Sequence, residues 1–85
     1  MQIQLRFFAR VREQLGSSED TAHVPDEVQT VGDVRDWLIR RGPIWADVLD
    51  QQKALRMALN HQMCEPDARI SPGCEVAFFP PVTGG

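Results

Sequence analysis

The sequence predicts one α+β domain, in which a mixed sheet packs on one main helix accompanied by short extra helices. Three observations support this fold class. Residues 2–7 alternate polar and apolar side chains, which is the two-residue period of a half-buried strand. A stripe of apolar residues at spacings of three and four begins at Val31, as in an amphipathic helix. The chain has 85 residues, 42% of them apolar and 25% charged, which is typical of a single globular domain.

The first strand is expected over residues 2–7, with Ile3, Leu5 and Phe7 on the face toward the core. By the same alternation Phe8 points away from the core. Because large apolar side chains are usually buried, this residue is a candidate for contact with a partner.

A short helix is expected over residues 9–15, because these residues are good helix formers and Gly16 suits a left-handed cap. Residues 17–20 are expected to form a turn. A short second strand over residues 21–24 should follow and end at Pro25.

The main helix is predicted to begin after Thr30, whose hydroxyl can cap the first turn, with Asp33 near the positive helix end. Gly42 and Pro43 should terminate it, and Pro43 can open a second short helix through Leu49. The stripe of the main helix consists of Val31, Val34, Trp37, Leu38 and Arg41.

The C-terminal part of the chain is predicted to be mostly strand. Residues 55–59 alternate as a strand, Asn60-His61 is a plausible two-residue turn, and residues 62–65 return beside them. Residues 71–73 turn the chain into a last strand over 75–79. One face of that strand carries Val76 and Phe78, and the other carries Ala77 and Phe79.

These elements follow in the order strand, short helix, strand, main helix and further strands. If the first and last strands lie side by side at the centre of the sheet, this order is the β-grasp arrangement. The domain is expected to span residues 1–79. Residues 80–85 should form an extended tail, because Pro80 and Pro81 lack the N–H groups needed for sheet pairing.

Composition and charge exclude several classes of function. Nine scattered basic residues against twelve acidic ones give a net charge of −3, so no nucleic-acid ligand is expected. The longest apolar run, residues 76–79, is too short to cross a membrane, and with no secretory leader the expected location is cytoplasmic. Two cysteines and two histidines match no zinc spacing, so no metal site is expected. Cys64 and Cys74 are expected to be small, partly buried hydrophobic residues.

The chemistry of the chain is expected at its C-terminus. The three serines lie in predicted turns without a placed histidine and carboxylate, and no glycine cluster precedes a helix, so neither a hydrolase triad nor a phosphate loop is expected. The last residues, Gly84 and Gly85, have no side chains and follow a stiff pair of prolines. Such a tail can enter a narrow channel and present a bare carboxylate, although a frayed terminus is the simpler alternative.

Two segments carry a resemblance to a known family. Residues 7–13 (FFARVRE) and residues 75–85 (EVAFFPPVTGG) resemble the opening and closing segments of the small, sulfur-carrying subunits of molybdopterin synthase, which are ubiquitin-like proteins. The resemblance covers essentially the whole chain. The closing segment is highly specific, whereas residues 17–52 match by pattern only.

The resemblance implies a cycle of sulfur transfer at Gly85, with Gly84 beside it. A ubiquitin-activating-type adenylyltransferase would adenylate the C-terminal carboxylate with ATP, and a persulfide donor would convert it to a thiocarboxylate, a 1-thioglycine. The sulfur would then pass to cyclic pyranopterin monophosphate to form the dithiolene of molybdopterin. The resemblance also implies that the large synthase subunit binds the substrate, in a heterotetramer of two small and two large subunits. The chain itself would bind no cofactor.

Three alternatives remain beside this reading. A thiamine-pathway sulfur carrier would use the same chemistry with a different acceptor, although such proteins are shorter. A ubiquitin-like protein modifier would join Gly85 to lysines of other proteins; the single lysine of this chain, Lys53, leaves little scope for chains. A β-grasp interaction module with an inert tail is the remaining alternative.

The docking surface for the large subunit is predicted where the tail leaves the domain. Phe8 and Phe79 both point outward at the ends of two strands that run parallel in a β-grasp sheet. Met63 is predicted to extend the same patch, and the resemblance places interface residues at these positions. The partner-binding set is predicted to be Phe8, Met63, Phe79, Pro80, Pro81, Val82 and Thr83.

Overall fold

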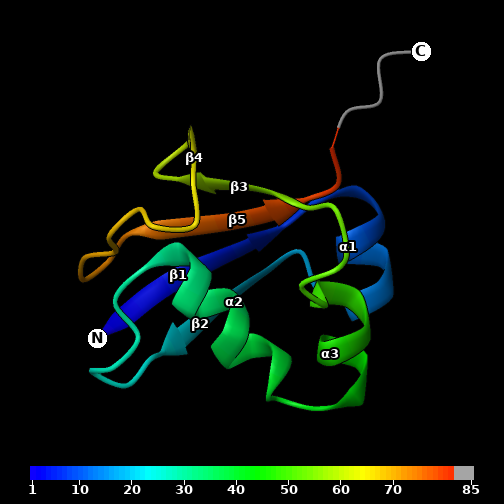
Figure 1. Cartoon of the computed structure of the whole chain (residues 1–85), viewed down its shortest axis with the longest axis horizontal. Coiled ribbons are helices and arrows are strands. Elements are labelled where there is room, and N and C mark those ends of the chain that lie inside the picture. Colours follow the sequence, from blue (N-terminus) through cyan, green and yellow to red (C-terminus); the bar gives the residue numbers. More distant parts are fainter. Residues whose placement is uncertain (82–85) are drawn as a thin grey trace.

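Five strands form one mixed sheet in the order β2-β1-β5-β3-β4 (Figure 1). The computed structural model describes residues 1–81. The central pair, β1 and β5, is parallel, and every other neighbouring pair is antiparallel. The β-grasp arrangement predicted from the sequence is therefore confirmed. The strands are β1 (Gln2–Phe7), β2 (Glu19–His23), β3 (Arg56–Leu59), β4 (Gln62–Cys64) and β5 (Glu75–Phe79).

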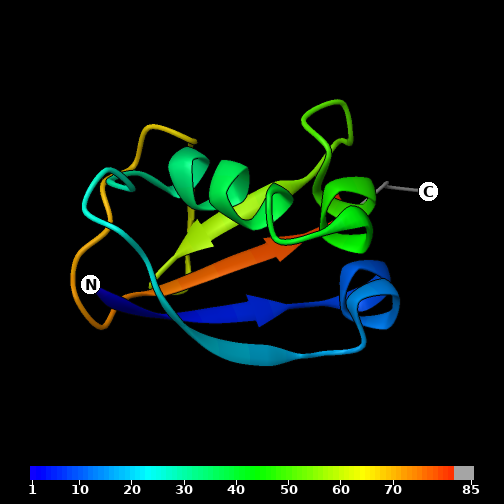
Figure 2. The same ribbon diagram turned by 90° about the horizontal axis from the view of Figure 1, so that it is seen from below.

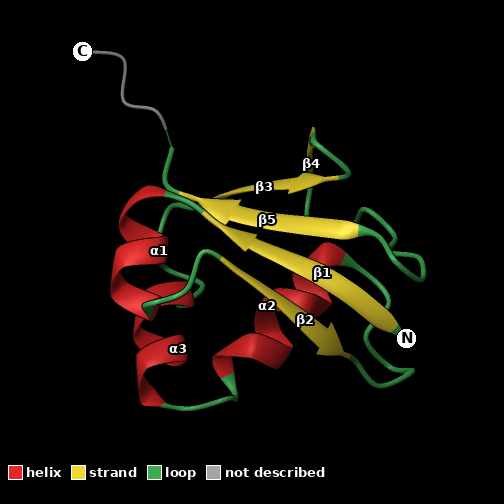
Figure 3. Cartoon of the chain, turned by 180° about the vertical axis from the view of Figure 1, so that it is seen from behind, coloured by secondary structure: helices red, strands yellow, loops and turns green. Residues whose placement is uncertain are grey.

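In the part of the chain that the structure describes, three helices cover one face of this sheet and leave the other face without helical cover (Figures 1 and 3). The longest helix, α2 (Val31–Ile39), lies across the inner face of the sheet (Figure 2). The two short helices, α1 (Ala9–Leu15) and α3 (Pro43–Leu49), lie together at the end of the sheet where β1 and β5 finish (Figure 3). One main helix with short extra helices is the layout that the sequence predicts.

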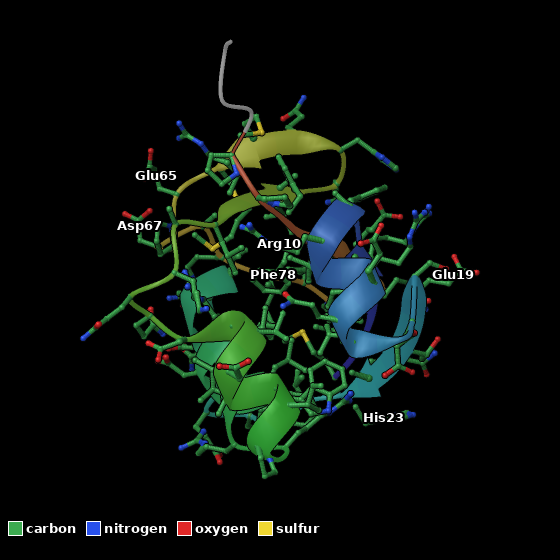
Figure 4. All side chains as sticks on the ribbon, turned by 90° about the vertical axis from the view of Figure 1, so that its right-hand side faces the viewer. Arg10, Glu19, His23, Glu65, Asp67 and Phe78 are labelled. Atoms are coloured by element: carbon green, nitrogen blue, oxygen red, sulfur yellow. The ribbon has the colours of Figure 1, made fainter. Side chains whose placement is uncertain are left out.

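The core lies between α2 and the inner face of the sheet. Phe7 and Phe78 are stacked with ring centroids 6.5 Å apart, and the rings of Phe7 and Trp45 meet edge to face with centroids 5.8 Å apart. Figure 4 shows Phe78 in the interior between the sheet and the helices. The alternation predicted for β1 is confirmed, since its inward residues are no more than 1% exposed. The fully buried residues of the two central strands and α2 are Ile3, Leu5, Phe7, Val31, Val34, Leu38, Val76 and Phe78.

The start of α2 is fixed by a capping box, as the sequence predicts. The Asp33 N–H donates to Thr30 Oγ1 at 3.1 Å, and the Thr30 N–H donates back to Asp33 Oδ2 at 3.3 Å. The Gln29 N–H also donates to Asp33 Oδ2, at 3.1 Å. These bonds satisfy N–H groups that have no partner within the helix.

The second strand begins earlier than expected. Residues 17–20 are predicted as a turn, but Glu19 and Asp20 already belong to β2 and pair with Arg6 and Leu5 of β1. Acidic residues are poor strand formers, and this prediction fails because pairing with a distant segment outweighs local preference. Each carboxylate also meets a cation: Glu19 Oε2 lies 3.8 Å from Arg6 Nε, and Asp20 Oδ2 lies 3.1 Å from Arg41 Nη1.

The end of α2 also differs slightly from the prediction. The helix ends at Ile39, before Gly42 and Pro43. Arg41 thus lies beyond the helix, and its guanidinium carbon is 5.0 Å from the Trp37 ring centroid and 4.8 Å from that of Trp45. Arg41 can therefore follow the apolar residues of the stripe, because its guanidinium packs on the Trp37 ring of α2 and on the Trp45 ring of α3.

Candidate docking surface at the C-terminal end of the sheet

Phe8 and Phe79 lie side by side on the outer face of the sheet, the face without helices. Phe7 is paired with Phe78 across the parallel strands, so the next residue of each strand points to the same side. The rings of Phe8 and Phe79 meet edge to face, with centroids 6.3 Å apart. Phe8 is 41% exposed and Phe79 is half-buried. The outward orientation that the sequence predicts for both side chains is confirmed.

The two rings form one wall of a hollow of about 420 Å³, which we call the outer hollow. Ala58 of β3 and Ala77 of β5 are direct cross-strand partners and lie in its lining, with exposed fractions of only 9% and 5%. Their small side chains leave a depression between larger neighbours. The outer hollow is lined by Phe8, Ala9, Ala58, His61, Glu75, Ala77, Phe79 and Pro80.

Charged side chains gather at one side of the outer hollow. The Glu75 carboxylate has two neighbours: its Oε1 lies 3.7 Å from Arg6 Nη1, and its Oε2 lies 3.4 Å from His61 Nδ1. The Arg6 guanidinium also lies over the Phe8 ring, 5.6 Å from its centroid. Partly exposed pairs of this kind contribute little to stability. Their arrangement gives an apolar hollow a charged border, which is the usual anatomy of a protein–protein interface.

The turn between β3 and β4 carries His61 to this border. Asn60 and His61 both have positive φ, 50° and 70°, as a tight two-residue hairpin turn requires. The Asn60 N–H donates to the Glu75 carbonyl oxygen at 2.8 Å, and the Glu75 N–H donates to Asn60 Oδ1 at 3.0 Å. The turn predicted from the sequence is confirmed, and these two bonds attach it to the start of β5.

Met63 lies next to the outer hollow but does not line it. It is the cross-strand partner of Ala58 and is 61% exposed, so it extends the apolar surface across β4. Its side chain contributes instead to a second, smaller depression of about 240 Å³. That depression is lined by Leu55, Arg56, Met57, Met63, Cys64 and Glu65.

The chain leaves the domain beside the outer hollow. Pro80 follows β5 directly and belongs to the lining, and Pro81 is half-buried. The other predicted site residues, Val82, Thr83, Gly84 and Gly85, lie outside the described residues. Their roles remain predictions.

The two cysteines show no sign of activation. Cys74 is 4% exposed, and both thiols are free. Burial raises the pKa of the Cys64 thiol, and the nearby carboxylates of Glu65 and Asp67, labelled in Figure 4, raise it further. A thiol with a raised pKa forms less of the nucleophilic thiolate.

Within residues 1–81 no group of three or more histidine, cysteine or acidic side chains is arranged to hold a metal ion. No helix in the same range is long and apolar enough to cross a membrane.

Sequence reasoning missed part of this surface. It singled out neither the alanine pair nor the contacts of Glu75 with Arg6 and His61. The signal for Ala77 was present, because alternation already places it on the same face as Phe79. Ala58 required the β3–β5 register, which pairs it with Ala77 and which no local pattern encodes.

The sequence of the chain is similar to one protein family and to characterised proteins over almost its whole length. The sequence profile of the ThiS family matches residues 5–85. A molybdopterin synthase sulfur carrier subunit from Escherichia coli is 40% identical over 83 residues, covering 98% of this chain and 99% of that protein. The protein of the same description from Haemophilus influenzae is 39% identical over 79 residues, covering 93% of this chain and 94% of its own length.

Solved structures agree with the fold. The crystal structure of SAMP1 from Haloferax volcanii superimposes with a TM-score of 0.76 and 26% identity, covering all of both chains. A molybdopterin converting factor subunit 1 protein from Pyrococcus furiosus superimposes with a TM-score of 0.78 at 21% identity, over 96% of this chain and 99% of that one.

Proposed function

The chain belongs to the ThiS family, and from this premise we propose that it is the sulfur-carrier subunit of a molybdopterin synthase. The observation that carries the proposal is the near-complete coverage, at 39% and 40% identity, of two proteins described as such subunits. These relatives favour the molybdopterin pathway over the thiamine pathway as the destination of the sulfur.

The proposed chemistry takes place on the Gly85 carboxylate. A carboxylate is a poor electrophile, so a ubiquitin-activating-type adenylyltransferase first joins it to AMP, using ATP and releasing pyrophosphate. The terminal sulfur of a persulfide donor then displaces AMP and forms an acyl disulfide. A thiol attacks the donor-side sulfur of this S–S bond, so a disulfide forms on the donor and the thiocarboxylate is released. This group is anionic at neutral pH and nucleophilic through a soft sulfur, and glycine leaves it unhindered.

The second stage proposed is sulfur delivery to cyclic pyranopterin monophosphate. The large synthase subunit would bind this substrate and supply the catalytic side chains, while the tail brings the sulfur into its pocket. Each dithiolene contains two sulfur atoms, so two charged carriers are consumed per product. A heterotetramer of two small and two large subunits suits this stoichiometry.

The outer hollow supports a docking role for the sheet face. Phe8 and Phe79 offer aromatic anchors, Ala58 and Ala77 leave room for a side chain of the partner, and Pro80 directs the tail away from the same place. Aromatic anchors beside a pocket dominate the binding energy of many interfaces. We propose that the large subunit packs on this surface, with Met63 at its edge.

A reconstitution experiment tests the proposed function. The chain carrying a thiocarboxylate is mixed with the large subunit and cyclic pyranopterin monophosphate, and dithiolene formation is measured. The same chain with an ordinary carboxylate is the control and should give no product. The proposal is wrong if the thiocarboxylated chain binds the large subunit yet transfers no sulfur.

A further inference from the structure

A strained residue joins β1 to α1, directly after the ring of Phe8 (Figure 3). Ala9 is the first residue of α1 and has a φ of 52°, in the left-handed region. An alanine is strained there because its Cβ atom crowds the following carbonyl oxygen. Among the described residues, the other non-glycine residues with positive φ are Asn60 and His61, whose hairpin turn requires such angles. The strain at Ala9 belongs to no hairpin and needs a different explanation.

The turn at Ala9 requires a positive φ but does not require a methyl group. Glycine adopts the same angle without strain. Ala9 is exposed, so its methyl group adds little to the core. What alanine adds is stiffness, because a methyl group removes many of the backbone conformations that are open to glycine. This stiffness acts on the residue next to Phe8, at a position that lines the outer hollow.

The hydrogen bonds that hold the backbone of Phe8 are long. The Phe8 N–H donates to the Phe78 carbonyl oxygen at 3.4 Å, and the Phe8 carbonyl oxygen accepts from the Arg12 N–H, also at 3.4 Å. Backbone hydrogen bonds are usually about 2.9 Å long, so these two bonds are weak. The restricted backbone of Ala9 therefore has a large share in keeping Phe8 in its extended conformation, with φ of −127° and ψ of 157°.

A second local cost lies beside the same ring. The Arg6 guanidinium lies over Phe8, and its Nε atom is buried without a hydrogen-bond partner among the described residues. The Glu19 carboxylate is 3.8 Å from this atom, which is beyond hydrogen-bond distance. A buried donor without a partner destabilises the fold, as a strained backbone does. Both costs thus adjoin one exposed side chain, and local strain of this kind is typical of positions where a functional group is held in place.

We infer that Ala9 is a positioning residue for docking, whose left-handed backbone holds the Phe8 ring against Phe79 before the partner arrives. This inference rests on the proposed docking of the large subunit. A ring that is already fixed in the free chain loses less conformational entropy when it is buried in the complex, so binding is tighter. The strain at Ala9 lowers the stability of the free chain. Stability and affinity therefore oppose each other at this residue.

The test compares three synthetic chains: the wild type, Ala9→Gly, and a chain with D-alanine in place of Ala9. Glycine relieves the strain but loosens the backbone, so the melting temperature should rise by about 4 °C while the Kd for the large subunit increases about threefold. D-alanine favours positive φ and keeps the backbone restricted. It should therefore raise the melting temperature at least as much and bind as tightly as the wild type. Scanning and titration calorimetry measure the two quantities.

A measurement without the partner separates this inference from the proposed function. Three-bond NMR couplings between the Phe8 backbone and its Cγ atom should show one rotamer in the wild type and the D-alanine chain, and averaging in Ala9→Gly. The inference is overturned if Phe8→Arg weakens binding but Ala9→Gly changes neither the couplings nor the affinity; the docking surface then stands.

Equal loss of affinity in Ala9→Gly and the D-alanine chain also overturns the inference, because D-alanine moves the methyl group and a direct contact of that group would then explain the result. Binding of Phe8→Arg at wild-type affinity contradicts the docking surface and the role of Ala9 together.

Discussion

The ring of Phe8 is exposed and that of Phe79 is half-buried, and both belong to the wall of the outer hollow. Replacing either by arginine removes an apolar anchor and forces desolvation of a charge. We expect Phe8→Arg and Phe79→Arg to weaken binding of the large synthase subunit by about 2 kcal/mol or more, about thirtyfold in Kd. Titration calorimetry measures this affinity, and thermal unfolding checks that each variant is folded.

A matched control is available on the other side of the molecule. Ile44 of α3 is 53% exposed and belongs to the helical layer. Ile44→Arg introduces the same charge without touching the outer hollow, and it should bind the large subunit as the wild type does. Unchanged affinity in both phenylalanine variants contradicts the proposed docking surface.

The cysteines give a second prediction for single residues. Cys64 has a raised pKa, so it forms less of the nucleophilic thiolate that a sulfur relay needs. Cys74 is 4% exposed, so a sulfur donor has little access to its thiol. The double variant Cys64→Ser with Cys74→Ser should accept sulfur at its C-terminus at an unchanged level, with some loss of stability from the buried hydroxyl. Mass spectrometry of the charged variant tests this. If a folded double variant accepts no sulfur, a cysteine takes part in charging.

At the scale of the elements, the stability of α2 depends on the hydrogen bonds that cap its first turn. The hydrogen bond from the Gln29 N–H to Asp33 is the main cause that lowers the pKa of this carboxyl from its ordinary 3.8, and the bonds from Thr30 lower it further. The folded-state pKa therefore lies below the unfolded value. The resulting stability is present above about pH 4 and is lost as acid protonates Asp33 below that value.

We expect Asp33→Asn to reduce the free energy of unfolding at pH 7 by about 1 kcal/mol, the usual effect of a lost cap. The difference between the variant and the wild type should shrink below pH 4, because the wild type then loses the same charge. Urea denaturation at pH 7 and pH 3 measures both values. A difference that is as large at pH 3 as at pH 7 contradicts this role of the carboxylate.

The elements also show which parts of the fold can be predicted locally. Alternation in β1, the cap at Thr30 and the turn at Asn60 are short-range signals, and the structure confirms each of them. The start of β2 and the burial of Arg35 are different, because both depend on partners distant in sequence. Arg35 is a charged residue in a helix, and only the fold brings three backbone carbonyl groups to it.

The outer hollow exists only at the scale of the whole molecule. It combines the residues that follow β1, the strands β3 and β5, and the turn before β4. Its shape therefore follows from the register of β1, β5 and β3 rather than from any motif. The sequence predicts its aromatic wall, because the alternation of side chains along a strand is enough to place Phe8 and Phe79 on the outer face. It does not predict the alanine pair or the charged border around Glu75, which need the pairing partners to be known.

The tail and the domain are expected to act as separate units. The buried hydrophobic core of the described residues extends from Ile3 to Phe78. Deleting Gly85 should therefore leave the melting temperature unchanged within about 1 °C, while it abolishes sulfur transfer. Calorimetry and dithiolene formation are measured on the same preparation. A deletion variant with full transfer activity contradicts the assignment of Gly85 as the reacting position.

The most direct measurement is the intact mass of the chain after incubation with ATP, the adenylyltransferase and a sulfide source. Exchange of one oxygen for sulfur adds about 16 mass units, and fragmentation should place this gain on Gly85. We predict one such gain per chain, and none when ATP is omitted. Adenylation without any gain of sulfur, or a gain that maps to Cys64 or Cys74, contradicts the sulfur-carrier function.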